Sequence, residues 1–95
     1  MGCGLIFEWD ERKRRGNLRK HGFDFADCAA VFTGRTATIM DDYDDYGETR
    51  FVTVGMLYGR MVAVAHTERE GAVRVISMRK AAIHEEAFFF ETVPD

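Results

Sequence analysis

The spacing of apolar and polar residues predicts that this 95-residue chain opens with a short strand followed by a helix. Residues 5–9 alternate Leu, Phe and Trp with Ile and Glu, a period typical of a strand. Residues 11–21 are almost entirely polar, with Asp10 as a suitable N-cap and Gly22 as a suitable stop. Because apolar residues are scarce there, we expect this helix to pack mainly through Leu18 and the stems of its long side chains.

Apolar residues at helical spacing predict a second helix over residues 25–32, with Asp24 as its cap and Gly34 beyond its end. We expect its buried stripe to consist of Phe25, Cys28, Ala29 and Phe32.

Runs of apolar and β-branched residues predict strands at residues 35–40, 50–57, 60–67 and 73–78. Tyr58-Gly59 and Gly71 mark tight turns between the last three. Hairpins this short allow only antiparallel pairing, so we expect an antiparallel meander sheet. Both faces of residues 61–65 are apolar, which predicts a central strand.

The chain is expected to end in a helix over residues 79–90. Its inward side chains would be Ala82 or Ile83, Ala87 and Phe90, with Glu85 and Glu86 facing solvent. The predicted fold class is therefore α+β, with two N-terminal helices, an antiparallel meander sheet and a C-terminal helix in one domain, residues 1–95.

The composition indicates a globular protein without a membrane-spanning segment. A hydrophobic content of 46% with one Pro indicates a folded globule without linkers. No apolar run is long enough for a membrane span and no export signal is recognisable, so we expect a cytoplasmic protein that does not bind membranes.

Cys3 and Cys28 lack the spacing of a metal site, and we expect Cys28 to be a reduced core thiol. The acidic residues 41–48 read as a solvent loop, because the ligand spacing of a calcium loop is absent.

Basic residues gather in the first helix, which carries six of the thirteen Lys and Arg residues and leaves the remaining chain at a net charge of −9. A basic segment that ends in His21 is a candidate polyanion-binding site. The alternative is an ordinary solvated helix face.

A second group of candidate residues lies at the end of the predicted sheet. Strand alternation places His66 and Glu68 on one face, and the last strand contributes Arg74 and Arg79. Cleavage of RNA by its own 2′-hydroxyl needs a base, cations and an acid, but no metal ion. Simpler interpretations are that His66 is a satisfied core histidine, that Glu68 pairs with Arg74 across the hairpin, and that His84 is merely exposed.

The sequence resembles the BrnT family of bacterial toxins from type II toxin–antitoxin pairs. The matching residues are Phe7-Glu8-Trp9-Asp10, Lys13, Asn17-Leu18-Arg19-Lys20-His21-Gly22, Phe25, Val31-Phe32, Arg50-Phe51-Val52-Thr53-Val54-Gly55, His66-Thr67-Glu68-Arg69, Arg74-Val75-Ile76-Ser77-Met78-Arg79-Lys80-Ala81 and Glu85. The chain departs from the family pattern at Met78, Ala82 and Phe89 and in its acidic, aromatic C-terminal segment. These departures weaken the expected electrostatic attraction for RNA.

This resemblance implies a RelE-like fold, metal-independent endoribonuclease activity and no cofactor. It also implies RNA as substrate, a BrnA-type antitoxin as partner, and contact with DNA only through that antitoxin; a homodimer is a further possibility. Carried over to this sequence, the predicted catalytic residues are His21, Glu68, Arg74 and Arg79, with either His21 or Glu68 as general base. The predicted RNA-binding residues are Trp9, Lys13, Lys20, Arg69 and Lys80, although Trp9 has an alternative role in the core. The alternative function is an inactive RNA- or protein-binding module of the same fold, held by its antitoxin.

Overall fold

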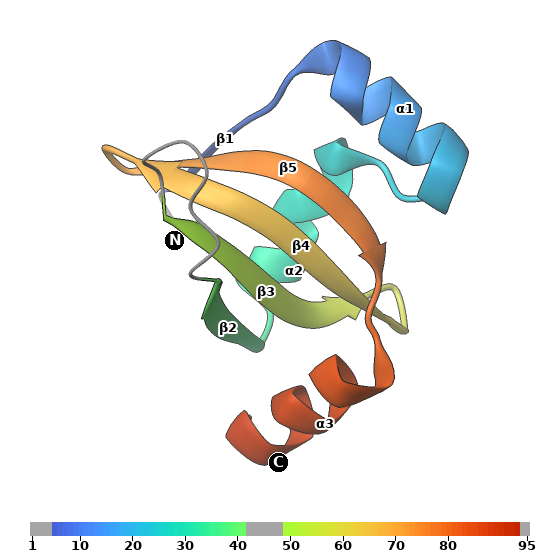
Figure 1. Ribbon diagram of the computed structural model, residues 1–95, viewed down its shortest axis with the longest axis vertical. Coiled ribbons are helices and arrows are strands. Elements are labelled where there is room, and N and C mark those ends of the chain that lie inside the picture. Colours follow the sequence, from blue (N-terminus) through green and yellow to red (C-terminus); the bar gives the residue numbers. More distant parts are fainter. Residues whose placement is uncertain (1–4, 42–48, 94–95) are drawn as a thin grey trace.

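The computed structural model describes residues 5–41 and 49–93, which form one five-stranded sheet with helices on both faces (Figure 1). The strand order is β1-β5-β4-β3-β2, so the predicted central strand, β4, is indeed central. The strands are β1 (Ile6–Glu8), β2 (Thr36–Asp41), β3 (Arg50–Leu57), β4 (Arg60–Arg69) and β5 (Ala72–Lys80), and the helices are α1 (Glu11–His21), the 3₁₀ turn η1 (Phe25–Asp27), α2 (Cys28–Thr33) and α3 (Ile83–Thr92). Most of the acidic segment predicted as a solvent loop, residues 42–48, lies outside the described residues.

The α+β class is confirmed, but the sheet is mixed rather than a purely antiparallel meander. Strands β2 to β5 pair antiparallel as predicted, whereas β1 pairs parallel with β5 through Ile6 and Ala72, Phe7 and Val73, and Glu8 and Arg74. The parallel pair joins residues more than sixty positions apart. No local pattern in the sequence specifies such a partner.

A β-bulge in β5 changes which of its side chains share a face. Ala65 of β4 lies opposite Ser77, but the next residue, His66, lies opposite Val75, so Ile76 is an extra residue on β5. Strict alternation along this strand would place Arg79 on the face of Val75 and Arg74 on the other face. The bulge shifts the alternation by one residue, and both arginines point to the face of the sheet that carries α3.

The two faces of the sheet bury separate clusters. Helices α1 and α2 cover one face, where the 3₁₀ turn and α2 contribute Phe25, Cys28 and Val31 (Figure 1). The predicted stripe of α2 is only partly right, because Phe25 and Cys28 are fully buried but Ala29 is exposed and Val31 is buried in its place. The first turn is 3₁₀, with the carboxylate of Asp24 accepting from the backbone N–H of Ala26 at 2.9 Å.

Helix α3 covers part of the opposite face and begins four residues later than predicted. Residues 79 and 80 are still paired with β4, and the N–H of Ala81 donates to the carbonyl of Met61 at 3.0 Å. The later start rotates the helix, so that Phe89 and Glu85 are buried whereas Ile83 and Phe90 are exposed. The sequence analysis had assigned these inward and outward positions wrongly.

Candidate functional site

A hollow of about 420 Å³ lies where α1, β4, β5 and α3 come together, at the end of β5. Figure 1 shows β5 ending on the side of the sheet where the chain turns into α3. Three basic side chains, one acidic and two apolar side chains line it: His21, Arg60, Lys80, Glu86, Phe23 and Met61. Groups that bind phosphate and groups that exchange protons thus share one concave surface.

His21 reaches the hollow because α1 is fixed at both of its ends. The Asp10 carboxylate caps the start by accepting from the backbone N–H groups of Arg12 and Lys13 at 2.8 and 3.2 Å. These two bonds lower the pKa of Asp10. At the other end, Gly22 adopts a left-handed conformation with φ of 78° and its N–H donates to the carbonyl of Leu18 at 2.9 Å. His21 is therefore the last residue of a well-terminated helix.

Asn17 attaches α1 to the strand that carries Lys80. Its side-chain amide is buried and donates to the carbonyls of Phe23 and Met78 at 3.0 and 2.9 Å. Its carbonyl oxygen accepts from the N–H of Met78 at 3.1 Å. These bonds hold the end of α1 against the end of β5. The predicted packing through Leu18 is wrong, since Leu18 is 41% exposed.

Arg60 and Glu86 lie in the hollow but were not predicted as site residues. The guanidinium of Arg60 lies over the ring of Phe23, 5.2 Å from its centroid, which positions this cation. Arg60 is the first residue of β4, directly after a tight turn, and Glu86 lies in the first turns of α3. No motif or spacing in the sequence distinguishes either residue from an ordinary charged residue that faces solvent.

Arg79, a predicted catalytic residue, is paired with Glu85 instead of facing the hollow. Its Nη1 and Nη2 atoms donate to Glu85 Oε1 and Oε2 at 2.7 and 2.9 Å, and Glu85 Oε1 also accepts from the N–H of Ala82 at 2.8 Å. The Arg79 guanidinium lowers the pKa of Glu85, and the same pair raises the pKa of Arg79. The sequence analysis had Glu85 facing solvent, whereas it is buried and anchors α3 to β5.

The remaining predicted catalytic residues lie at the opposite end of the sheet. Arg74 Nη1 is 3.5 Å from Glu8 Oε2, and both side chains are about two-fifths exposed. Glu68 does not pair with Arg74 across the hairpin; it lies opposite Val73, and its carboxylate is 3.8 Å from His66 Nδ1. Arg74 and Lys80 are six positions apart along β5, a distance of about 20 Å at about 3.3 Å per residue. The structure therefore does not bring Arg74 or Glu68 together with His21.

His66 is a core residue. It is fully buried, its Nε2 lies 2.7 Å from the hydroxyl of Thr53, and its ring stacks on Phe51 with centroids 5.7 Å apart. A second ring, Phe32, meets it edge-on at 5.3 Å. Burial lowers the pKa of His66 to about 4, so that it is neutral at physiological pH. The simpler interpretation of a core histidine is right, but the histidine is only partly satisfied, because its buried Nδ1 has no hydrogen-bond partner among the described residues.

The predicted RNA-binding residues are spread over four regions. Trp9 is half-buried against the core, edge-on to Phe25 with centroids 6.3 Å apart. Lys13 and Lys20 are exposed on α1, Arg69 is exposed at the far end of β4, and Lys80 lines the hollow. Only Lys80 and His21 of the predicted site residues line this hollow.

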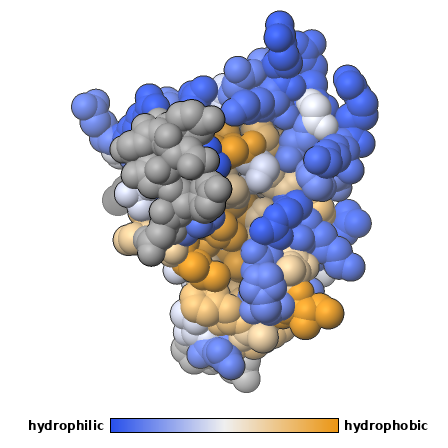
Figure 2. Space-filling view, viewed as in Figure 1, coloured by the Kyte–Doolittle hydropathy of each residue, from blue (hydrophilic) through white to orange (hydrophobic). Residues whose placement is uncertain are grey.

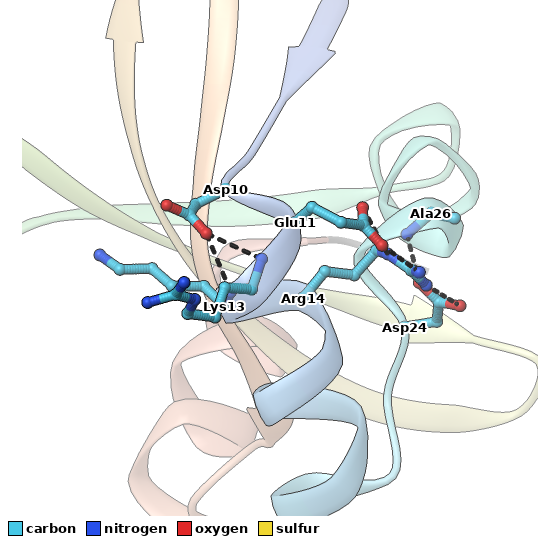
Figure 3. A network of polar contacts seen from close by, with 7 residues as sticks. Asp10, Glu11, Lys13, Arg14, Asp24 and Ala26 are labelled. Carbon is cyan, nitrogen blue, oxygen red and sulfur yellow. Dashed lines mark hydrogen bonds and ion pairs between the residues drawn. The ribbon is translucent and has the colours of Figure 1, made fainter.

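Part of the basic charge on α1 is used to hold the fold together. Figure 3 shows Arg14 between two carboxylates, Glu11 on its own helix and Asp24 at the start of η1. Arg14 Nη1 donates to both oxygens of Asp24 at 3.1 Å, and its Nη2 pairs with Glu11. The pKa values of Glu11 and Asp24 are lowered, that of Glu11 mainly by Arg14 and that of Asp24 mainly by the N–H of Ala26.

The described part of the chain lacks both a cluster of metal ligands and a helix that could span a membrane. Within residues 5–41 and 49–93, no three His, Cys, Asp or Glu side chains are grouped so as to hold a metal ion. Cys28 is buried, as predicted, and burial raises its pKa to about 12. No helix among these residues has the length and apolar character needed to cross a membrane.

Comparison with known proteins identifies the family. Residues 9–85 match the profile of the family described as "Ribonuclease toxin, BrnT, of type II toxin-antitoxin system". A search of curated proteins finds no match to the chain. The matched region runs from Trp9 to Glu85, so it includes His21, Arg60 and Lys80 but ends just before Glu86. The chain belongs to the BrnT family of ribonuclease toxins of type II toxin–antitoxin systems.

Proposed function

We propose that this chain is a metal-independent endoribonuclease whose reaction centre is the hollow at the end of β5. The observation that carries the proposal is the meeting of His21, Arg60, Lys80 and Glu86 on one concave surface, from four separate elements. The family membership supports ribonuclease activity in general terms. The proposal keeps His21 and Lys80 from the predicted site and assigns the reaction to neither Glu68 nor Arg74.

The reaction follows from the chemistry of these groups. His21 accepts the proton of a ribose 2′-hydroxyl, and the 2′-oxygen attacks the adjacent phosphorus. The bond from phosphorus to the 5′-oxygen breaks, the Lys80 ammonium donates a proton to the leaving oxygen, and a 2′,3′-cyclic phosphate remains. Arg60 holds the non-bridging oxygens, on which negative charge builds. Glu86 is the second candidate for the base.

The electrostatics of the surroundings favour a polyanionic substrate. Lys20 and Arg19 are exposed on the last turn of α1, next to His21, and extend the basic surface beyond the hollow. A backbone that follows α1 therefore meets His21 where the helix ends. Binding that rests on such phosphate contacts weakens steeply with salt.

Two departures from the family pattern, Met78 and Phe89, lie outside the lining of this hollow, whereas Glu86 of the acidic C-terminal segment is part of it. Phe89, where the family pattern has a Tyr, is buried among Ala37, Val54 and Ala63, and is absent from the lining of the hollow. Met78 is fully buried. Neither replacement removes a group from the proposed centre.

Cleavage of a structured RNA by the purified chain in excess chelator tests the proposal. We expect cleavage with wild-type protein, and a loss of about 100-fold or more in rate for His21→Ala and for Lys80→Ala. Arg74→Ala is the matched control, because it removes a basic side chain from the other end of the same strand. We expect it to keep most of the wild-type rate. His21→Gln and Glu86→Gln compare the two candidate bases.

Two results would contradict the proposal. One is a loss of cleavage in Arg74→Ala with normal cleavage in Lys80→Ala, which would move the centre to the other end of β5. The other is RNA binding without any cleavage by the folded wild-type protein. That result would favour the inactive binding module.

The family implies an antitoxin protein as partner. We extend this to a BrnA-type antitoxin that supplies the DNA-binding part of the pair. Growth arrest on induction of this chain, relieved by co-expression of such an antitoxin, is the corresponding test in cells.

A further inference from the structure

Helix α3 exposes an apolar stripe on the side that faces away from the sheet. Ile83 is 85% exposed and Phe90 is 67% exposed, and the exposed Ala87 lies between them. Their spacing of four and three residues places all three on one face of the helix. The opposite face buries Phe89 and Glu85, so α3 has apolar side chains on both sides. Figure 2 shows apolar surface on this lower part of the molecule.

We propose that this stripe binds the same stripe of a second copy of the chain, with the two α3 helices antiparallel. In such a two-fold arrangement each residue meets the position that mirrors it along the stripe, so Ile83 of one copy packs on Phe90 of the other. Ala87 lies near the middle, where the helices cross, and its small side chain lets them approach closely. The stripe has large side chains at its ends and a small one at the crossing, so its shape is complementary to that of a second, antiparallel copy.

The polar side chains beside the stripe agree with an antiparallel pair. His84 and Glu91 are seven residues apart, so they lie on the same flank of the stripe, at opposite ends of α3, and both are exposed. A two-fold axis brings His84 of one copy opposite Glu91 of the other, and does so twice. On the other flank, Glu86 lies in the hollow with Arg60 and Lys80, so its charge is offset within its own copy.

The interface is small, and the dimer is correspondingly weak. From residue 83 to residue 90 the stripe is about 10 Å long, at 1.5 Å per residue. A stripe of this length buries less surface area than a standard stable interface, so we expect a dimer that forms only at high protein concentration. Two of the three residues of the stripe, Ala87 and Phe90, lie outside the part of the chain that matches the family, which ends at residue 85. The inference is independent of whether the chain cleaves RNA.

Sedimentation equilibrium of the full chain, from low micromolar to near-millimolar concentration, tests the proposal. We expect the average mass to rise from that of a monomer towards that of a dimer. Phe90→Glu and Ala87→Glu should remain monomeric over the same range. Ile6→Glu is the matched control, because Ile6 is 66% exposed on β1, at the edge of the sheet opposite to β2. It should associate as the wild type does.

A charge exchange tests the antiparallel orientation. His84→Glu places two carboxylates opposite each other and should weaken association several-fold, and adding Glu91→Lys should restore it. Circular dichroism confirms that each variant is folded. A wild-type chain that stays monomeric at every concentration would overturn the proposal. So would a Phe90→Glu variant that dimerises normally, or a His84→Glu variant that Glu91→Lys does not rescue.

Discussion

The two ends of β5 carry similar charged residues in different settings. At the Lys80 end, α1 and α3 close over the strand, Arg79 is held by two bonds to a buried carboxylate, and Lys80 shares a hollow with His21 and Arg60. At the Ala72 end, Arg74 and Glu8 lie 3.5 Å apart on an open edge of the sheet. The charges alone do not distinguish the two ends. The neighbouring helices form a hollow at one of them.

The difference also separates two roles of arginine. Arg79 is fixed by Glu85 and contributes to the attachment of α3, whereas Arg60 lies over the ring of Phe23 and lines the hollow. An arginine whose donors already meet a carboxylate has fewer left for a phosphate. The family resemblance had made Arg79 a predicted catalytic residue, whereas Arg60 was not predicted as a site residue.

Removing the Asn17 side chain, which attaches α1 to β5 at the Lys80 end, should have the largest effect on stability. Asn17→Ala leaves the buried N–H and carbonyl of Met78 and the carbonyl of Phe23 without their partner. We expect the free energy of unfolding to fall by about 3 kcal/mol, measured by urea denaturation. Leu18→Ala, one residue along the same helix, should cost less than about 1 kcal/mol. Equal losses in the two variants would mean that α1 is held by general packing.

The next effect concerns the other end of the sheet, where His66 is buried. Its folded pKa of about 4 is below its ordinary value of 6.5, so the unfolded chain binds the proton more readily as the pH falls. Stability should therefore decrease by about 2 kcal/mol between pH 6.5 and pH 5, in addition to the titration of other groups. In His66→Gln this part of the pH dependence should disappear. The exposed His84→Gln should keep it, and an unchanged profile for His66→Gln would contradict the assignment.

The smallest expected effect compares the two arginine–carboxylate pairs directly. Glu85→Gln removes the charge that Arg79 binds and should cost about 1.5 kcal/mol at neutral pH. Glu8→Gln, at the exposed pair with Arg74, should cost less than about 0.5 kcal/mol. Because the folded pKa of Glu85 is lowered, its contribution is complete above its ordinary pKa of 4.5 and is lost as the pH falls through the lowered value. Urea denaturation at neutral and acidic pH measures both costs, and equal costs at neutral pH would show that burial of Glu85 adds nothing.

Local chemistry determined much of the fold in advance. The bounds of α1 follow from Asp10 and Gly22, and those of β3 and the start of β4 follow from apolar runs on either side of Tyr58-Gly59. The apolar character of both faces of residues 61–65 placed β4 in the centre of the sheet. These signals lie within a few residues of the structure that they specify, so the sequence alone contains them.

Only the tertiary structure decided the parallel pairing of β1 with β5, the bulge at Ile76 and the rotation of α3. Each depends on the register between distant segments. A shift of one residue in that register moves a side chain to the other face. The same cause explains the site: His21 and Lys80 could be named from their neighbours in the sequence, but Arg60 and Glu86 became candidates only when four elements met around one hollow.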